Sequence, residues 1–569
     1  MSEREGLKFG ILCSSLTFYR WQAEITELLI ANGHQPSLII MKAKEESSIS
    51  GFQKFKQYPW KLLLYRLYQR YIFKPVMKQE VEMSQTLKNV PVQYCQIRKV
   101  DFSEFFADED VSFILQQKLD FILRFGFNIL RGKVLQAARY GIWSFHHGDE
   151  QRYRGGPPCF WEIYRNDPVT GAVLQKLNEK LDGGVILRKG WFGTIKHSYR
   201  ENLERVYAGS VPWVLQVCND IQNDIAGYLD APGSSTQAQV SKAPGNLLMI
   251  WFAIKISTNR IRFHLKDILL HEKWNIGYIE APMEKVAFRW DAYSKRIKWL
   301  PKPSSNTYVA DPFVYNLGEV HRVVYEKYDY SGMRGDIGQL TLDLNESNET
   351  GVAALNDGSH FSFPFLFEHG VDIYCLPENA ASGKLSLYRL SCNEKSFEHV
   401  TDLLPEPIID PVLFKWGAYW WLFGTMLGYP SESLYIWYST QMEGPFQAHI
   451  NNPVKTDISS SRSAGKPFIV GNTLYRPAQN CSRTYGGSLV INQVLTLSPE
   501  EFIEQPATEL FPLKKWQFSK GMHTLSGSGN ITVIDAKRMQ FIPIASWNKL
   551  KMKVGIRLTT KSGLESLEV

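Results

Sequence analysis

The chain has 569 residues, too many for one hydrophobic core, which predicts two or three domains. Apolar residues make up 44% and charged residues 21%, a balance that excludes an intrinsically disordered chain. The net charge of +7 is modest for this length. It excludes the basic composition typical of nucleic-acid-binding proteins and allows an acidic small molecule or an anionic membrane surface as partner.

The seven cysteines are scattered, with no C-x-x-C pair and no His/Cys cluster at metal-ligand spacing. An odd, scattered set predicts reduced thiols, so we expect a cytoplasmic protein without a metal site. No apolar run reaches the roughly 18–20 residues that a membrane span needs. The sequence gives no prediction of the oligomeric state.

The first part of the chain predicts an α/β domain. An apolar strand at 7–14 is followed by a helical pattern from about 18 to 31, which Gly33 ends, and by a second strand at 36–41. A strand, a helix and a strand at this spacing form a βαβ unit, which favours a parallel sheet. Residues 120–125 predict a further buried strand.

Two stretches predict how this domain is bounded. Residues 52–80 are basic and aromatic, which favours either an amphipathic helix on an anionic membrane or a surface helix covered by its own Lys and Arg side chains. Residues 231–245 are polar and predict a linker, and 247–270 predict a bridging helix. The expected domains are therefore 1–225, a linker with bridging helix at 226–272, and a third part at 273–569.

From about residue 274 the pattern changes to short alternating strands. A weak internal repeat begins each time with a proline-led apolar strand, as in ADPFVY, SFPFLF, IDPVLF and GKPFIV. Regularly spaced short strands with a repeat of several tens of residues predict the blades of an all-β propeller.

The densest chemistry lies at residues 141–156, GIWSFHHGDEQRYRGG. It follows a buried strand, and ligands of open α/β sheets bind at the carboxyl ends of strands. Asp182 follows His146 by 182 − 146 = 36 residues, in another loop before an apolar strand. An imidazole with a carboxylate can deprotonate an attacking amine. A structural loop histidine is the alternative interpretation of His146.

The same stretch resembles the formyltransferase fold shared by methionyl-tRNA, glycinamide ribonucleotide and sugar N-formyltransferases. The matching residues are Gly141, His146, Tyr153, Arg154, Gly155, Thr170-Gly171 and Leu181-Asp182-Gly183-Gly184. The resemblance covers about residues 7–220 and implies a Rossmann-like α/β domain with N10-formyltetrahydrofolate as formyl donor.

The resemblance also implies roles for single residues. His146 would accept the amine proton and Asp182 would orient it. The donor would lie along a loop formed by Arg124, Phe125, Gly126, Phe127 and Asn128. The family's asparagine, which donates to the developing oxyanion, is Ser144 here, and loss of one such donor costs about 2.7–4 kcal/mol. The family's S-L-L-P is replaced by residues 148–151, so the folate and acceptor sides are expected to differ.

The charged residues of this stretch allow two interpretations. Arg152 and Arg154, with Tyr153 between them, would bind a phosphate of the acceptor, or the two arginines would pair with Asp149 and Glu150. Asp149 and Glu150 would otherwise be solvated loop charges.

The second half resembles the five-bladed propeller of one clan of glycoside hydrolases. It resembles more closely the N-terminal domain of plant glucosamine inositolphosphorylceramide transferases, over about residues 275–535, through ADPFV, HFSFPFLFE, IDPVLF and YRPAQNCSRTYGG. The candidate channel residues are Asp311, Glu326, His360, Glu378, Asp410, Arg462, Arg476 and His523.

These channel residues have three open interpretations. The carboxylates would act as acid and base of glycoside cleavage, would hydrogen-bond a sugar, or would be turn residues that stabilise a blade. Arg476 and Tyr485, which flank Gln479, favour a polar ligand pocket. Of the candidates, we expect Asp311, Glu326, Glu378, Asp410 and Arg476 to contact a substrate.

The sequence thus predicts a formyltransferase that acts on the amino group of an amino sugar carried on a nucleotide, a lipid or a glycan. The propeller would bind the glycan, with no nucleic-acid partner and with peripheral membrane contact. The alternative is a propeller-based glycan hydrolase, transferase or binding protein with a degenerate formyltransferase domain.

Overall fold

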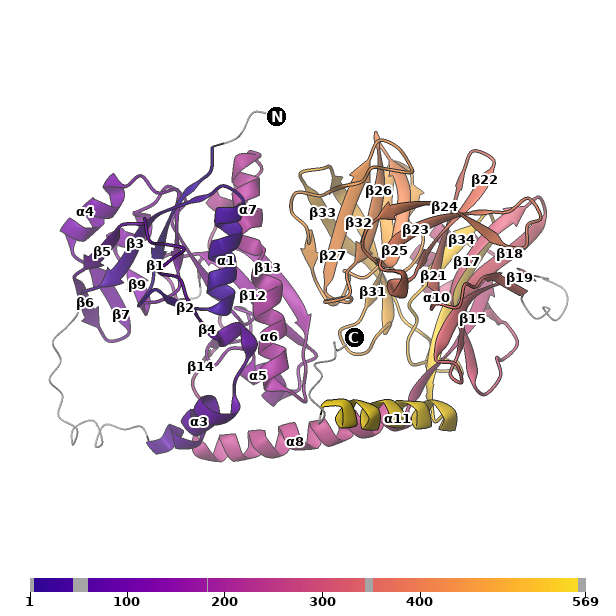
Figure 1. Ribbon diagram of the computed structural model, residues 1–569, viewed down its shortest axis with the longest axis horizontal. Helices are drawn as coiled ribbons and strands as arrows, with labels where there is room; N and C mark the ends of the chain where they lie inside the picture. Colours follow the sequence, from indigo (N-terminus) through magenta and orange to yellow (C-terminus); the bar gives the residue numbers. More distant parts are fainter. Residues whose placement is uncertain (1–4, 44–59, 182, 343–351, 561–569) are drawn as a thin grey trace. The chain divides into compact units, whose positions relative to one another are not determined.

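The computed structural model describes residues 5–43, 60–181, 183–342 and 352–560 (Figure 1). The chain divides into two compact units, one up to Arg260 and one from Ile261. The division falls within helix α8 (Asn246–Leu269), which occupies the predicted bridging helix.

The N-terminal unit contains a seven-stranded sheet in the order β13-β12-β10-β8-β1-β3-β5. Its first five strands in the chain run parallel, and β12 and β13 are antiparallel. The strands are β1 (Lys8–Leu12), β3 (Gln35–Lys42), β5 (Val92–Cys95), β8 (Phe121–Arg124), β10 (Ile142–His146), β12 (Val169–Lys176) and β13 (Val185–Gly193). The prediction of a parallel α/β sheet is confirmed.

Alternate strand residues point to opposite faces of this sheet, and both faces are apolar. Helices therefore cover both faces. Phe9 and Ile11 belong to a core with α1 (Arg20–Ala31), α6 (Tyr199–Ser210) and α7 (Trp213–Gln222). Leu12 and Ile122 belong to a second core with α4 (Asp108–Gln116). The short helix α5 (Phe160–Arg165) joins the first core.

The described part of this unit also contains three small sheets. They are β2 (Thr17–Tyr19) with β4 (Glu80–Glu82), β6 (Ile97–Val100) with β7 (Ser103–Phe106) and β9 (Ile129–Arg131), and β11 (Arg154–Gly155) with β14 (Val240–Ser241). The last pair corrects the prediction that 231–245 is a plain linker, because Val240 and Ser241 add a strand to the loop after His146.

The basic aromatic stretch does not form one long helix over its described part, residues 60–80. It forms separate turns, Trp60–Leu62, α3 (Leu63–Leu67), Tyr68–Ile72 and Val76–Lys78. Phe73 stacks on Tyr199 with ring centroids 4.3 Å apart, and Tyr68 packs on Phe252 of α8. Part of the aromatic surface is therefore used inside the unit, whereas Trp60 and Tyr71 are 49% and 66% exposed. Residues 52–59 lie outside the described residues.

The C-terminal unit is a β-propeller in which five sheets follow one another along the chain (Figure 1). Neighbouring sheets contact through their first strands, as β17 does with β21 and β21 with β25. Two of the sheets consist of β17 (Thr307–Leu317), β18 (Val320–Asp329), β19 (Arg334–Leu342) and β20 (Val352–Leu355), and of β21 (Ser362–His369), β22 (Asp372–Glu378), β23 (Leu385–Leu390) and β24 (Phe397–Leu404). The next sheet consists of β25 (Ile409–Trp416), β26 (Tyr419–Thr425), β27 (Ser433–Ser439), β28 (Gln447–Ala448) and β29 (Lys455–Thr456). The sheet after it consists of β30 (Phe468–Val470), β31 (Thr473–Asn480), β32 (Ser488–Leu497) and β33 (Phe502–Leu510).

The fifth sheet closes the propeller with strands from both ends of the unit. It joins β15 (His271–Ile279) and β16 (Lys298–Trp299) to β34 (Leu525–Ser528) and β35 (Ile531–Gln540). β15 pairs with β35 over its whole length, from His271 opposite Gln540 to Ile279 opposite Thr532. The remaining helices of this unit are α9 (Met283–Phe288), α10 (Trp290–Tyr293) and α11 (Pro543–Thr560).

The first strands of three successive sheets share a local distortion. Asp311, Phe363 and Asp410 each precede a proline, have φ of 50°, 42° and 46°, and lie where the pairing register shifts. Asp311 therefore lies inside β17, which begins at Thr307. Such bulges redirect a side chain at a backbone cost of about 1–3 kcal/mol, which marks them as functional candidates.

Candidate functional site

Ser144 and His146 lie at the carboxyl end of β10, next to Arg124 at the end of β8. The strand alternation places Trp143 and Phe145 on the other face. Trp143 stacks on Phe121 at 4.1 Å, which anchors β10 in the core. The two polar side chains thus share the edge where open α/β sheets bind ligands.

The His146 ring is held by the loop that follows it. Its Nε2 lies 2.8 Å from the backbone oxygen of Tyr153. A carbonyl oxygen only accepts, so Nε2 is the protonated nitrogen of the neutral ring. A Cβ on Gly148 would lie 3.0 Å from this nitrogen, so glycine lets the loop pack on the imidazole. Asp182 lies outside the described residues.

The serine at the family's asparagine position is tied to a cation. Ser144 is buried, and its Oγ accepts a hydrogen bond from Arg124 Nη1 at 2.8 Å. Arg124 Nη2 donates to the oxygen of Phe127 at 3.1 Å. One guanidinium therefore connects the end of β10 with the predicted donor loop.

The loop at 125–128 is fixed by the strand beside it. The N–H groups of Phe125 and Gly126 both donate to Leu12 O, at 2.8 and 2.9 Å. A Cβ on Gly126 would lie 2.9 Å from Ser14 Oγ, so a larger residue would push the loop off the end of β1. The loop is therefore held against the end of β1 by two backbone hydrogen bonds.

The far end of this loop is held by a buried acid. Asn128 donates to Glu104 through its backbone N–H and its side chain, both at 2.8 Å. Lys42 pairs with Glu104 at 2.5 Å and lies 4.7 Å from the ring centre of Phe127. Asn128 thus has its polar groups directed at Glu104.

Both interpretations of Asp149 and Glu150 are wrong. These carboxylates are buried rather than solvated, and they pair with Lys189 at 3.1 and 3.0 Å rather than with Arg152 or Arg154. A buried carboxylate needs a cation, and β13 supplies Lys189, which is distant from both acids in the sequence.

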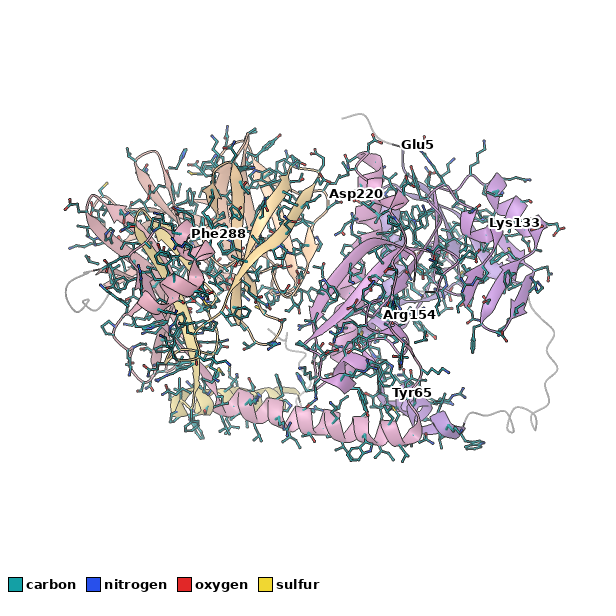
Figure 2. The ribbon with its side chains drawn as sticks, turned by 180° about the vertical axis from the view of Figure 1, so that it is seen from behind. Glu5, Tyr65, Lys133, Arg154, Asp220 and Phe288 are labelled. Atoms are coloured by element: carbon teal, nitrogen blue, oxygen red, sulfur yellow. The ribbon has the colours of Figure 1, made fainter. Side chains whose placement is uncertain are left out.

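The two arginines and the tyrosine between them have structural partners. Arg152 pairs with Asp167 at 3.1 Å, and the Tyr153 hydroxyl donates to the same carboxylate. Arg154, seen between Asp220 and Tyr65 in the view of Figure 2, donates to Leu181 O at 2.8 Å and Ala238 O at 3.3 Å. Arg154 therefore fixes the residue that precedes position 182.

His147, the second histidine of the pair, is a core residue. Its ring packs edge-on against Trp21 at 5.2 Å, and its Nε2 lies 3.3 Å from Ser210 Oγ. Burial lowers the pKa of His147 well below its usual value, and repulsion from His146, when it is protonated, and from Lys78 lowers it further. Lys78 and His146 are thus the cations that disfavour protonation of the His147 ring.

Lys78 belongs to a pocket of about 760 Å³ that the sequence did not predict. The pocket is lined by Tyr19, Tyr65, Arg66, Gln69, Arg70, Phe73, Lys74, Pro75, Lys78, Gln79 and Glu80. Lys78 Nζ lies 5.6 Å from the ring centre of Tyr19 and 5.8 Å from that of Phe73. Burial lowers its pKa, with a lesser opposing effect from Cys159. Within the described residues Lys78 has no carboxylate partner, so the pocket favours an anion.

The propeller brings most of its predicted residues into one buried cluster. At its centre Asp410 accepts from Arg462 Nε at 2.5 Å and Nη2 at 3.2 Å, and from Gln479 Nε2 at 2.7 Å. The Asp410 N–H donates to Glu378 at 3.1 Å. Arg462 lies over the ring of Tyr485 at 4.8 Å.

The second part of the cluster surrounds Asp311. Thr524 Oγ1 donates to Asp311 Oδ1 at 2.8 Å, and the Asp311 backbone N–H donates to Asp535 at 3.0 Å. His523 Nδ1 lies 2.6 Å from Asp535 and 3.6 Å from Asp311. These three side chains are close enough to share a cation, although His523 and Asp535 bond directly here. The spacing of neighbouring residues gave no sign of this group, because its members lie far apart in the chain.

The cluster shifts several proton equilibria. Burial raises the pKa of Asp311 to about 6 and that of Glu378 to about 8. Burial also raises the pKa of Glu326 well above its usual value. For His523 burial lowers the pKa, but Asp535 and Asp311 outweigh it and raise the pKa. A carboxyl group that keeps its proton near neutral pH can act as a general acid.

The remaining two predicted residues of the propeller are His360 and Arg476. His360 lies beside Glu326, since a Cβ on Gly335 would touch both side chains at 2.9 and 2.5 Å. Arg476 does not join the cluster. It is buried in a two-point ion pair with Glu504, at 2.8 and 2.6 Å, so its expected place in a ligand pocket is corrected.

Sequence reasoning missed Asp535 and Thr524. A signal for Asp535 was present, because it is the charged residue inside the apolar strand ITVIDA, where an isolated carboxylate must find a partner. Thr524 carried no such signal, since a threonine in a strand is ordinary.

Comparison with known proteins separates the two units. The family described as "Glucosamine inositolphosphorylceramide transferase 1, N-terminal" matches residues 297–542. The rice protein of that name (Oryza sativa subsp. japonica) is 36% identical over 208 residues, covering 35% of this chain and 28% of the relative. The C-terminal unit is similar to this propeller-like domain.

The N-terminal unit has a weaker similarity. Methionyl-tRNA formyltransferase of Prochlorococcus marinus (strain MIT 9312) is 31% identical over 84 residues, covering 14% of this chain and 25% of that protein. The chain thus spans about a quarter of the length of these relatives, which are all named as transferases. Among solved structures, the family 117 glycoside hydrolase Zg3597 of Zobellia galactanivorans matches with 11% identity and a TM-score of 0.30, covering 41% of this chain and 85% of that one.

The buried carboxyl groups predict a pH-dependent propeller. The pKa of Glu378 rises from 4.5 to about 8 on folding, so the fold binds this proton more tightly than the unfolded chain does. Its stabilisation is complete below about pH 4.5 and is lost as the pH rises through about 8. We expect Glu378→Gln, which keeps the shape without titrating, to reduce the loss of stability in urea unfolding between about pH 5 and pH 8. The exposed Glu368→Gln should keep the wild-type dependence, and equal behaviour of both variants would contradict this assignment.

Proposed function

We propose that the N-terminal unit transfers a formyl group from N10-formyltetrahydrofolate to the amino group of an amino sugar. The observation that carries this proposal is the position of His146 at the carboxyl end of β10, held by Tyr153 O, with the Ser144–Arg124 pair beside it. The similarity to a bacterial formyltransferase over 84 residues supports the same reaction class.

The residues present fit the formyl donor. The loop from Arg124 to Asn128 is fixed by Leu12 and Glu104, so it offers a formed surface at a strand edge to a flat heterocycle. When bound, the donor supplies an activated one-carbon group. Ser144 and Arg124 would orient the formyl oxygen, and the arginine charge would compensate for the missing asparagine.

His146 would take the proton of the attacking amine. Because Nε2 is protonated toward Tyr153 O, the neutral ring accepts at Nδ1. Asp182, through the loop that Arg154 fixes at Leu181, would stabilise the imidazolium.

The acceptor is assigned from the propeller and the basic pocket. The plant relatives carry glucosamine, an amino sugar, in their name, and the C-terminal unit matches their N-terminal domain. The buried Asp410, Glu378 and Asp311 would hydrogen-bond the glycan. The pocket around Lys78 would hold a phosphate of the acceptor, since it presents cations and aromatic rings together. The cytoplasm, where nucleotide sugars and folates are available to such an enzyme, is the proposed location.

His146→Ala is expected to lower formyl transfer by about 10²–10⁴-fold, because a positioned base contributes this much. The measurement is release of tetrahydrofolate from N10-formyltetrahydrofolate in the presence of a panel of amino-sugar nucleotides and glycolipids. His197→Ala, a histidine of the same unit outside the site, serves as the matched control. Release that needs no amine, or that survives in His146→Ala, would argue against the proposal.

Lys78→Met should raise the KM for a phosphate-bearing acceptor by about tenfold or more and leave kcat nearly unchanged, because it removes a charged donor from binding. Inorganic pyrophosphate should compete with the acceptor in the wild type and lose this effect in the variant. Lys88→Met, at an exposed lysine outside the pocket, is the control. An unchanged KM would remove the pocket from acceptor binding.

A second candidate function is glycan cleavage or binding by the propeller alone, favoured by the raised pKa of Glu378 beside the Asp410–Arg462 pair. It differs from the first in needing no folate.

Asp410→Asn separates the two functions. If the propeller is catalytic, this variant should lose hydrolysis of glucosamine-containing oligosaccharides by at least about 10²-fold, since a charged group is lost from the cluster. Formyl transfer to small acceptors should persist. Asp402→Asn, at a half-exposed carboxylate paired with Lys384, is the control. No hydrolysis by the wild type, together with unchanged glycan binding by Asp410→Asn, would exclude this candidate.

A further inference from the structure

One face of helix α8 fixes it to the protein. Phe252 is buried and stacks on Phe160 at 4.1 Å. On the same side Lys255 donates to Tyr164 O at 2.7 Å, and Asn259 donates to Lys196 O at 2.9 Å. These contacts set the rotation of the helix about its own axis, so the opposite face is defined too.

The opposite face is an exposed apolar stripe. Trp251 is 65% exposed and Leu247 is 77% exposed, although both are large apolar residues. Residues at helical spacing on this face are Leu247, Ile250, Trp251, Ile254, Ile261, Leu265 and Leu269, all exposed among the described residues. The stripe has an N-terminal part, up to Ile254, and a C-terminal part, from Ile261, with the polar Ser257 and Thr258 between them. Exposed apolar residues grouped in this way mark a docking surface.

The stripe is bordered by positive charge. Arg260, Arg262 and Lys266 lie along the same helix and are exposed. The acidic residue of α8, Asp267, is paired with both Lys549 and Lys553 of α11, so it does not offset them.

Helix α11 extends the same kind of surface. It runs beside the end of α8 (Figure 1), joined through the Asp267 ion pairs. Trp547, Leu550 and Val554 are exposed on it at spacings of three and four residues, next to Lys551. Apolar residues with tryptophan and flanking lysines therefore occur on both helices.

We propose that α8 docks on an anionic lipid bilayer and lies in its interfacial plane with the apolar stripe inserted. Exposed tryptophans suit the membrane interface, and the flanking arginines and lysines suit anionic headgroups. No described helix combines the length and apolarity needed to span a bilayer, so the helix lies on the membrane rather than across it.

This inference goes beyond the proposed reaction and does not depend on it. The sequence alone had suggested membrane contact at 52–80, and the described part of that stretch packs Tyr68 and Phe73 inside the unit but leaves Trp60 and Tyr71 49% and 66% exposed. If formyl transfer is also established, docking through α8 would bring the enzyme to acceptors carried on a lipid.

The test is sedimentation of the full chain with vesicles of phosphatidylcholine containing phosphatidylglycerol. Wild type is expected to bind the vesicles. Ile254→Glu should bind them with an affinity at least about tenfold lower, because a charge enters the stripe. Val371→Glu, at a fully exposed apolar residue of the propeller, should bind as wild type does. Circular dichroism checks that each variant is folded.

A second variant keeps the test decisive if Ile254→Glu fails to fold. Arg260→Gln with Arg262→Gln should weaken binding about fivefold for each charge on anionic vesicles, and should have little effect with pure phosphatidylcholine. The proposal is overturned if wild type does not sediment, or if all variants sediment equally. It is also overturned if light scattering shows a dimer that Ile254→Glu dissociates in the absence of vesicle binding.

Discussion

Compensation of buried charge is the constraint on which both units depend. An ionised group removed from water must find a partner, because the cost of leaving it alone exceeds most single interactions in a fold. Asp410 finds Arg462, and Arg476 of β31 finds Glu504 of β33, two strands away in the same sheet. Lys78 in its pocket departs from this rule among the described residues, which is why we assign it an anionic ligand.

The same constraint shows which arginines use their donors inside the fold. Arg154 and Arg152 look alike in the sequence, yet their donors meet Leu181 O and Asp167 within the fold. Arg124, in contrast, connects Ser144 with the donor loop at a strand edge. In the propeller the bulges at Asp311 and Asp410 direct carboxylates inward at a cost in backbone strain that a purely structural turn does not require.

The two units suggest a division of labour. In the proposed function the N-terminal unit performs group transfer and the propeller binds the glycan, and the separate inference on α8 places the chain at a lipid surface. Each role rests on a different physical feature: a fixed imidazole, a buried carboxyl cluster with raised pKa values, and an exposed apolar stripe bordered by arginine.

The sequence by itself determined the parallel sheet, the bridging helix and the propeller, because these follow from periodicity and turn residues along neighbouring positions. It also indicated His146 and Asp410, since motifs place them. Only the tertiary structure decided the partners of Asp149 and Arg476, the inclusion of Asp535 and the exposure of Trp251. These depend on contacts between residues far apart in the chain, and local pattern carries no information about which distant side chain will meet a buried charge or cover an apolar face.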